Sequence, residues 1–145
     1  MNKTKVQGSC FCGAIQFEID LPSKFVAHCH CSECRRSSGA PLVTWIGTWE
    51  DKFRVISGKE NLTVYSDSPE VTREFCRTCG TQLFFRCDRW KGEVHVTRSS
   101  ILSDVDRAPQ AHVFYSDKAH WYEQWAKLPV LGGENGTTPL EGAAQ

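Results

Sequence analysis

Seven of the eight cysteines in this chain of 145 residues stand in three short clusters with the spacing of metal ligands. The clusters are Cys10-Phe11-Cys12-Gly13, Cys29-His30-Cys31-Ser32-Glu33-Cys34 and Phe75-Cys76-Arg77-Thr78-Cys79-Gly80. Thiolates one or two residues apart can reach the same ion without a long loop closing around it. A structural zinc takes four protein ligands, whereas a reactive zinc takes three and keeps one position open. The seven cysteines therefore predict one closed site and one open site, with two zinc ions per chain.

We assign Cys10, Cys12, Cys76 and Cys79 to the closed, structural site, because a glycine follows Cys12 and another follows Cys79. The backbone turns sharply under the metal in such a site, and glycine tolerates the positive φ angle that the turn needs. The four ligands come from distant parts of the chain. The ion would therefore tie the first strands to the later sheet and contribute directly to the free energy of folding.

The remaining cysteines, Cys29, Cys31 and Cys34, are assigned to the open, catalytic-type site. A zinc ion held by three thiolates carries one net negative charge, and it acidifies water less than a zinc held by three histidines. We expect it to exchange its fourth position for another thiol, which stays nucleophilic and can attack an electrophile such as an aldehyde. A fourth protein ligand would instead close the site, and the candidates are His28, His30, His95, His112, Cys87 and Glu33.

Two other uses of paired cysteines compete with metal binding. Cys10 and Cys12 are too close for an unstrained disulfide, and so are Cys29 and Cys31. Neither CxxC pair stands in the βαβ pattern of a thioredoxin. The first ten residues contain no apolar run typical of a signal peptide, so we expect a cytoplasmic protein whose cysteines stay reduced.

Composition excludes two classes of partner. Lysine and arginine together number 17, as do aspartate and glutamate, so net charge indicates neither nucleic acid nor a membrane surface. No stretch approaches the roughly 18 apolar residues of a membrane span. The expected partner is a small molecule, and the length fits one domain.

Short strands between turn residues must position the clusters. Alternating apolar and polar residues predict strands over 13–20, 24–28, 42–49, 53–56, 62–66, 72–76, 82–87 and 93–97. A polar stretch over 32–38, ending at Gly39, predicts one or two helical turns. This spacing indicates a mainly β, mostly antiparallel domain over residues 1–131. Residues 132–145, which are rich in Gly and Thr, are predicted to be a disordered tail.

Residues outside the clusters carry weaker signals. His28 and His30 could donate a hydrogen bond near Cys29 or relay a proton, and a purely structural role fits them equally well. His95 is expected on the face opposite Val94 and Val96.

Other residue types are expected in structural roles. Cys87 is expected to be a buried free thiol. Four arginines could meet substrate carboxylates, but exposed arginines are most often plain surface, so no binding role is assigned to Arg35, Arg36, Arg73 or Arg77. The tryptophans are expected in the core or a pocket wall; they are Trp45, Trp49, Trp90, Trp121 and Trp125.

The cysteine motifs also carry a family resemblance. The stretches GSCFCG (8–13), CHCSECRRSSG (29–39) and FCRTCGTQL (75–83) resemble the glutathione-dependent formaldehyde-activating enzyme family, which includes centromere protein V. The likeness continues through residues 100–104, 109–114, 118–121 and 128–129, and so spans roughly residues 6–131. It implies a β-tent fold of several small antiparallel sheets stapled by structural zinc. It also implies the same division of the seven cysteines between a structural and a catalytic-type zinc.

The resemblance implies an activity as well. The family's namesake reaction condenses glutathione with formaldehyde to S-(hydroxymethyl)glutathione, and it is classed with the carbon–sulfur lyases. The motifs specify zinc rather than substrate. We therefore expect a zinc-dependent carbon–sulfur lyase that binds a small thiol such as glutathione. The alternative is a non-catalytic zinc module that binds a protein or a thiol; a basic extension would favour it, and this sequence has none.

Overall fold

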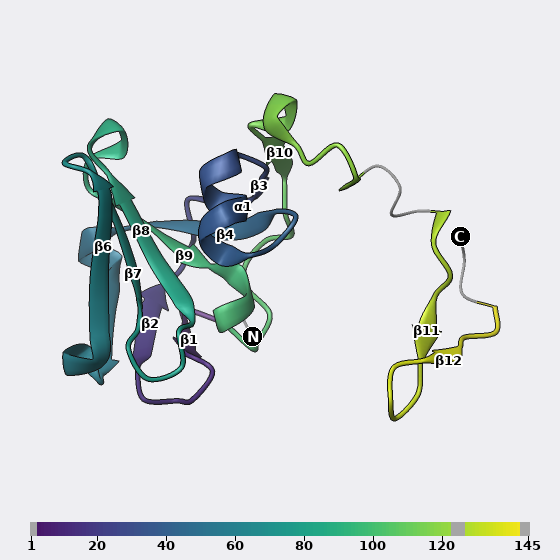
Figure 1. The fold of residues 1–145 in the computed structure, drawn as a ribbon. Helices are drawn as coiled ribbons and strands as arrows, with labels where there is room; N and C mark the ends of the chain where they lie inside the picture. Colours follow the sequence, from purple (N-terminus) through teal and green to yellow (C-terminus); the bar gives the residue numbers. More distant parts are fainter. Residues whose placement is uncertain (1–2, 123–126, 143–145) are drawn as a thin grey trace.

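Two sheets packed around a common core form the body of the protein (Figure 1). The computed structural model describes residues 3–122 and 127–142. The smaller sheet is antiparallel with the strand order β1-β2-β5, formed by β1 (Lys5–Ser9), β2 (Gln16–Asp20) and β5 (Phe53–Ser57).

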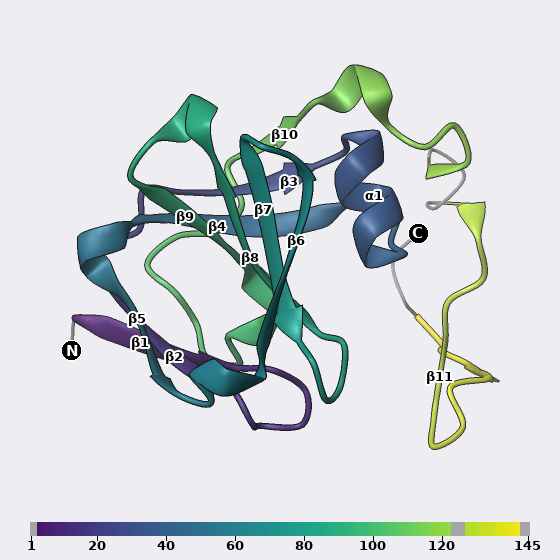
Figure 2. The same ribbon diagram turned by 60° about the vertical axis from the view of Figure 1, so that its left-hand side comes forward.

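The larger sheet has seven strands in the order β10-β3-β4-β9-β8-β7-β6. Its strands are β3 (Phe25–Cys29), β4 (Val43–Trp49), β6 (Leu62–Ser68), β7 (Val71–Cys76), β8 (Gln82–Cys87), β9 (Glu93–Thr97) and β10 (Ala111–Val113). Every neighbouring pair is antiparallel except β10 and β3, which are parallel. In Figure 2, β3 and β4 run across β6 and β7, so the sheet is strongly twisted.

Helical segments are short. The α-helix α1 (Ser32–Ser38) lies between β3 and β4 and ends at Gly39, which has a φ of 65°. Single turns of 3-10 helix connect strands elsewhere, at η1 (Glu50–Lys52), η2 (Lys59–Asn61), η3 (Asp88–Trp90), η4 (Arg98–Ser100) and η5 (Tyr115–Asp117). No helix in the described parts of the chain is long and apolar enough to cross a membrane.

The main core lies between the two sheets. Phe17 of β2 is fully buried there against Phe84 of β8, with ring centroids 5.1 Å apart in an edge-on arrangement. Strand alternation places Val94 and Val96 of β9 on the same side, although all five residues of this strand are buried. Burial of such large side chains supplies most of the driving force for folding.

A second core lies on the other face of the larger sheet. It contains Cys29, Cys34, Val43, Trp45 and Phe85, and helix α1 contributes Cys34 to it. The larger sheet therefore has packed side chains on both faces, and one cysteine cluster lies in each core.

The mainly β fold of several sheets confirms the sequence expectation. The predicted strand over 13–20 starts later, at Gln16, because the backbone N–H of Ile15 turns back to donate to the Cys10 sulfur. Sequence reasoning did not find β1 or β10. Val6 is the only strongly apolar residue of β1, and all three residues of β10 are exposed, so neither strand shows alternation.

The C-terminal segment forms a small hairpin of β11 (Leu131–Gly132) and β12 (Thr138–Pro139). It stands apart from the two packed sheets in Figure 1. All of it except Leu131 falls within the range 132–145 predicted as a tail, and the domain boundary at residue 131 stays a prediction.

Candidate metal centres

The first cysteine cluster consists of Cys10, Cys12, Cys76 and Cys79, and we call it the four-cysteine cluster. Its four sulfur atoms lie within 4.8 Å of one another. The Cys12 sulfur is 3.6 Å from that of Cys10 and 3.8 Å from that of Cys76. A tetrahedral zinc with bonds of about 2.3 Å would hold its sulfur ligands about 3.8 Å apart, so the spacing fits a zinc ion.

Two similar turns build the four-cysteine cluster. The Gly13 N–H donates to the carbonyl of Cys10, and the Gly80 N–H donates to the carbonyl of Cys76. Gly13 has a φ of 80° and Gly80 a φ of 78°, values that glycine adopts without strain. The predicted role of these two glycines is therefore confirmed.

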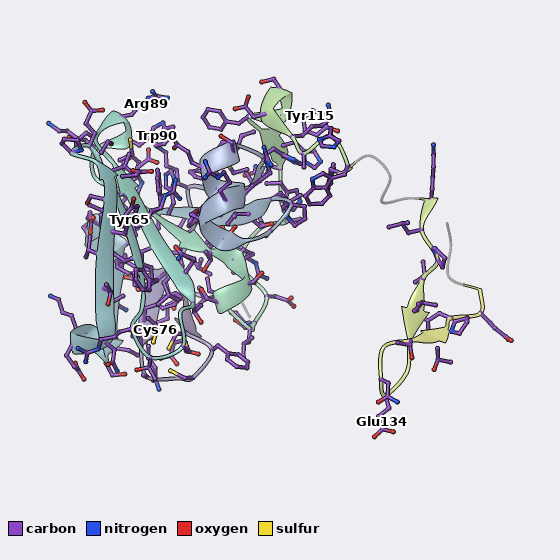
Figure 3. All side chains as sticks on the ribbon, in the orientation of Figure 1. Tyr65, Cys76, Arg89, Trp90, Tyr115 and Glu134 are labelled. Atoms are coloured by element: carbon purple, nitrogen blue, oxygen red, sulfur yellow. The ribbon has the colours of Figure 1, made fainter. Side chains whose placement is uncertain are left out.

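Thr81 links the two turns. Its hydroxyl oxygen accepts a hydrogen bond of 3.0 Å from the backbone N–H of Phe11 and lies 3.1 Å from the Cys79 sulfur. The hydrogen bond to Thr81 lowers the pKa of the Cys79 thiol to about 5. Figure 3 shows Cys76 at one end of the body, with other sulfur atoms beside it, and Trp90 toward the opposite end.

The second cluster consists of Cys29, Cys31 and Cys34, and we call it the three-cysteine cluster. Its sulfur atoms also lie within 4.8 Å of one another. Cys29 ends β3, Cys31 caps the N-terminus of α1, and Cys34 follows in the first turn of that helix. The Cys34 N–H donates to the Cys31 sulfur at 3.3 Å, so the start of the helix holds the cluster in shape.

Within residues 3–122 and 127–142, no fourth histidine, cysteine or carboxylate joins the three-cysteine cluster. Among the candidate fourth ligands, Cys87 packs against the core that contains Cys29 and Cys34 without joining the cluster, and others have different partners or face solvent. His28 bonds the Thr44 hydroxyl, His95 bonds Glu93, and the side chain of Glu33 is 70% exposed. The arrangement could hold a metal ion with three protein ligands.

Aromatic side chains wall the three-cysteine cluster on the inner side. Trp45 and Phe85 pack with the buried Cys29 and Cys34, whereas Cys31 is only partly buried. An N–H of the Trp45 indole also bonds the Cys34 sulfur. Access from outside is therefore on the side of Cys31.

Arg73 of β7 is a site residue that sequence reasoning did not assign. Its side chain is 6% exposed and its guanidinium donates to the Cys34 sulfur at 3.9 Å. Hydrogen bonds from the Cys29 and Cys31 thiols, together with the charge of Arg73, lower the pKa of the Cys34 thiol to about 3. The alternation of β7 was a usable signal, because residues three apart in a strand face opposite sides and Arg73 cannot share the side of Cys76.

The segment after β10 packs beside the cysteine turn. His30 is fully buried, and its Nε2 atom lies 2.8 Å from Nδ1 of His112. Its backbone N–H donates to the Val113 carbonyl. Arg35 of α1 donates to the His30 carbonyl and to the Asp117 carbonyl. These contacts give His30 a structural role beside Cys29 and fix the position of α1.

Other sequence expectations have mixed outcomes. His95 does face away from Val94 and Val96, since its ring packs against Phe25 and Trp90. Cys87 is only partly buried.

The tryptophans and arginines differ in how far they are buried. Trp45 is buried, as a core role requires. Trp49 is 40% and Trp121 53% exposed, and each lines a surface hollow, which agrees with the alternative of a pocket wall; Trp125 lies outside the described residues. Arg36 and Arg77 are exposed, as expected.

A large hollow of the described surface lies elsewhere. It has a volume of 1210 Å³, and its lining includes His28, Thr44, Thr97 and Leu102 but none of the cysteines of the three-cysteine cluster. Since His28 and Cys29 are neighbours in β3, their side chains point to opposite faces of the sheet. The three-cysteine cluster is therefore defined by its ligand chemistry and not by this hollow.

The fold and the two clusters define a small, mainly β protein with two candidate metal centres. Residues 5–117 match the family model of the glutathione-dependent formaldehyde-activating enzymes. A Halomonas elongata protein whose name places it in that family is 31% identical over 126 residues, which cover 81% of this chain and 80% of that protein. An uncharacterized lyase of Schizosaccharomyces pombe is 26% identical, covering 81% of this chain and 83% of that protein.

A solved structure agrees with these sequence matches. The crystal structure of a Rhodobacter sphaeroides protein superposes with a TM-score of 0.62 at 28% identity, covering 74% of this chain and 99% of that one. The chain belongs to the glutathione-dependent formaldehyde-activating enzyme family.

Proposed function

We propose that this chain is a zinc-dependent enzyme of the carbon–sulfur lyase type, which binds glutathione at the three-cysteine cluster and adds its sulfur to formaldehyde. One observation carries the proposal. Three sulfur atoms lie close enough to share an ion, with no fourth such donor near them in the described ranges. A metal held by three protein ligands keeps a position for substrate.

The two clusters would divide the metals. Cys10, Cys12, Cys76 and Cys79 supply four ligands and would close a structural zinc site. Cys29, Cys31 and Cys34 supply three and would hold a zinc of catalytic type. Thiolate ligands suit zinc, and their number decides which site can take a substrate.

Bound zinc would hold a thiol as its thiolate, which remains nucleophilic. The chain's own residues would do the rest. Strand β3 and helix α1 fix the positions of the three sulfurs, and Trp45 and Phe85 keep water from their inner side. In the reaction the thiol sulfur forms a bond to the carbonyl carbon, the carbon–oxygen π bond opens, and the thiol proton ends on the new hydroxyl group. No further reactant is needed.

Family membership supports the choice of substrates, since the family is described by glutathione and formaldehyde. The name of the yeast relative supports the lyase class for that protein, and by likeness for this one. Glutathione is the abundant thiol of reducing compartments, in line with the predicted cytoplasmic location.

The test measures thiol binding and adduct formation with the zinc-loaded full chain. Calorimetry follows glutathione binding, and NMR exchange measurements follow the rate at which glutathione and formaldehyde form their adduct. We expect the wild type to bind glutathione and to raise that rate, and Cys31→Ser to lose both. Cys87→Ser, which removes a cysteine outside both clusters, is the matched control and should keep both. Absence of thiol binding by the zinc-loaded wild type would refute the proposal and favour a non-catalytic zinc module.

A further inference from the structure

Arg73 is a buried cation whose ion pairs with carboxylates, among the described residues, are long ones. Its nearest carboxylates are Glu33 and Asp67, each 3.8 Å away, which is beyond a normal hydrogen bond between nitrogen and oxygen. Both are more exposed to solvent than Arg73 itself, with side-chain exposures of 70% and 30% against 6%. Burying a charge is costly unless it is paired.

The remaining partner of Arg73 is the three-cysteine cluster. The guanidinium donates to the Cys34 sulfur at 3.9 Å. The guanidinium carbon also lies over the ring of Phe85, 4.9 Å from its centroid. Arg73 is therefore held by an aromatic face and a sulfur atom of the cluster.

We propose that Arg73 is the positioning residue that neutralises the three-cysteine metal centre and so sets its preference for an anionic fourth ligand. Three thiolates and a divalent ion leave one negative charge, which repels an incoming thiolate. The guanidinium, which contacts Cys34, offsets that charge from inside the fold while it also pairs with Glu33 and Asp67. This inference rests on the proposed function, because it concerns the choice of ligand at the same centre.

The position of Arg73 favours an effect of its charge on the cluster over direct binding of the carboxylates of a substrate. A guanidinium that is 6% exposed is poorly placed to receive the carboxylates of glutathione from solvent. It acts instead through Cys34, which it touches. Loss of the charge should therefore weaken the binding of every thiolate, including one from a thiol without carboxylates, and should spare neutral ligands.

The experiment uses the full chain loaded with Co²⁺, whose visible spectrum reports exchange of the fourth ligand. Three probes are titrated: glutathione, 2-mercaptoethanol and imidazole. In Arg73→Met we expect both thiols to bind about 10- to 100-fold more weakly, the range that follows from losing a charge-assisted hydrogen bond. Imidazole affinity should change less than about threefold. Arg73→Lys, which keeps the charge, should restore most of the thiol affinity.

Arg36→Met is the matched control, because Arg36 is an exposed arginine on the helix that carries Cys34. It should bind all three probes like the wild type. Equal loss of thiols and imidazole in Arg73→Met, unchanged thiol binding, or loss of glutathione alone would each overturn the inference.

Two further outcomes are decisive. Should Arg73→Met not fold, Arg73→Gln removes the charge but keeps a polar side chain; equal loss of thiols and imidazole, or unchanged thiol binding, in that variant also refutes a charge role. If the wild-type protein binds no thiol at all, the proposed function fails instead, so the two failures are distinguishable.

Discussion

Replacing Cys76 with serine should unfold the protein, whereas replacing Cys31 should remove one metal and leave the fold. Both substitutions exchange a sulfur ligand for a hydroxyl of similar size. They differ in what the ion holds together. In the four-cysteine cluster, Cys12 and Cys76 meet across 64 positions of the chain. The three-cysteine cluster spans only the five positions from Cys29 to Cys34.

The sequence separation sets part of the expected difference. Loop-closure entropy grows as 1.5 RT times the logarithm of loop length, so the longer loop adds about 2 kcal/mol to the stabilisation by its ion. Burial adds more, because Cys76 is fully buried in the main core and a serine hydroxyl there would lack the metal as partner. Structural zinc contributes roughly 10–16 kcal/mol of apparent binding free energy in small zinc domains. Typical domains are stable by only about 5–15 kcal/mol, so loss of this ion exceeds the margin.

Elemental analysis and thermal unfolding followed by circular dichroism would measure the difference. We expect two zinc ions in the wild type, one zinc and a cooperative unfolding transition in Cys31→Ser, and no cooperative transition in Cys76→Ser. Cys87→Ser should keep two zinc ions and unfold like the wild type. If Cys31→Ser and Cys76→Ser lose stability and metal to the same extent, the division into a structural and an open cluster is wrong.

Two further predictions concern stability and are measured by urea unfolding. Gly58→Ala should destabilise the protein by well over the roughly 1 kcal/mol expected for Gly39→Ala. Both glycines have positive φ angles, but only at Gly58 would the new methyl carbon lie 1.8 Å from a backbone oxygen, that of Ala14. Similar losses of stability in the two variants would contradict the steric argument. Hydrogen bonds, led by that of Gln7, lower the pKa of Glu18 to about 2. The ionised carboxylate therefore stabilises the fold above the unfolded-state pKa of about 4.3, and this contribution is lost as the pH falls toward 2. Stability should therefore fall more steeply from pH 5 to pH 2 in the wild type than in Glu18→Gln, and parallel pH curves would count against the assignment.

The cysteine clusters were predictable because their information is local. Spacing of one or two residues, and glycines after Cys12 and Cys79, already imply chelating turns, and the structure shows those turns with the expected φ angles. Helix α1 was predictable for the same reason, since Gly39 marks its end. Strand β1 was not, because Gly8 takes the place of an apolar residue there and the ring of Phe17 fills the space.

The surroundings of the three-cysteine cluster depend on long-range pairing. Arg73 lies 39 positions from Cys34, and β7 reaches it only through the order of strands in the larger sheet. In the sequence this arginine stands three positions before Cys76. Strand alternation places the two side chains on opposite faces, but it cannot name the partner on the other face.

Strand β7 connects the two candidate centres. Its two buried residues are Arg73, which contacts the three-cysteine cluster, and Cys76, which belongs to the four-cysteine cluster on the opposite face. An ion in the four-cysteine cluster would fix the end of β7, and a fixed β7 holds the guanidinium beside Cys34. A structural metal would then do more than stabilise the fold, because the position of the charge beside the open centre depends on the strand that this metal holds.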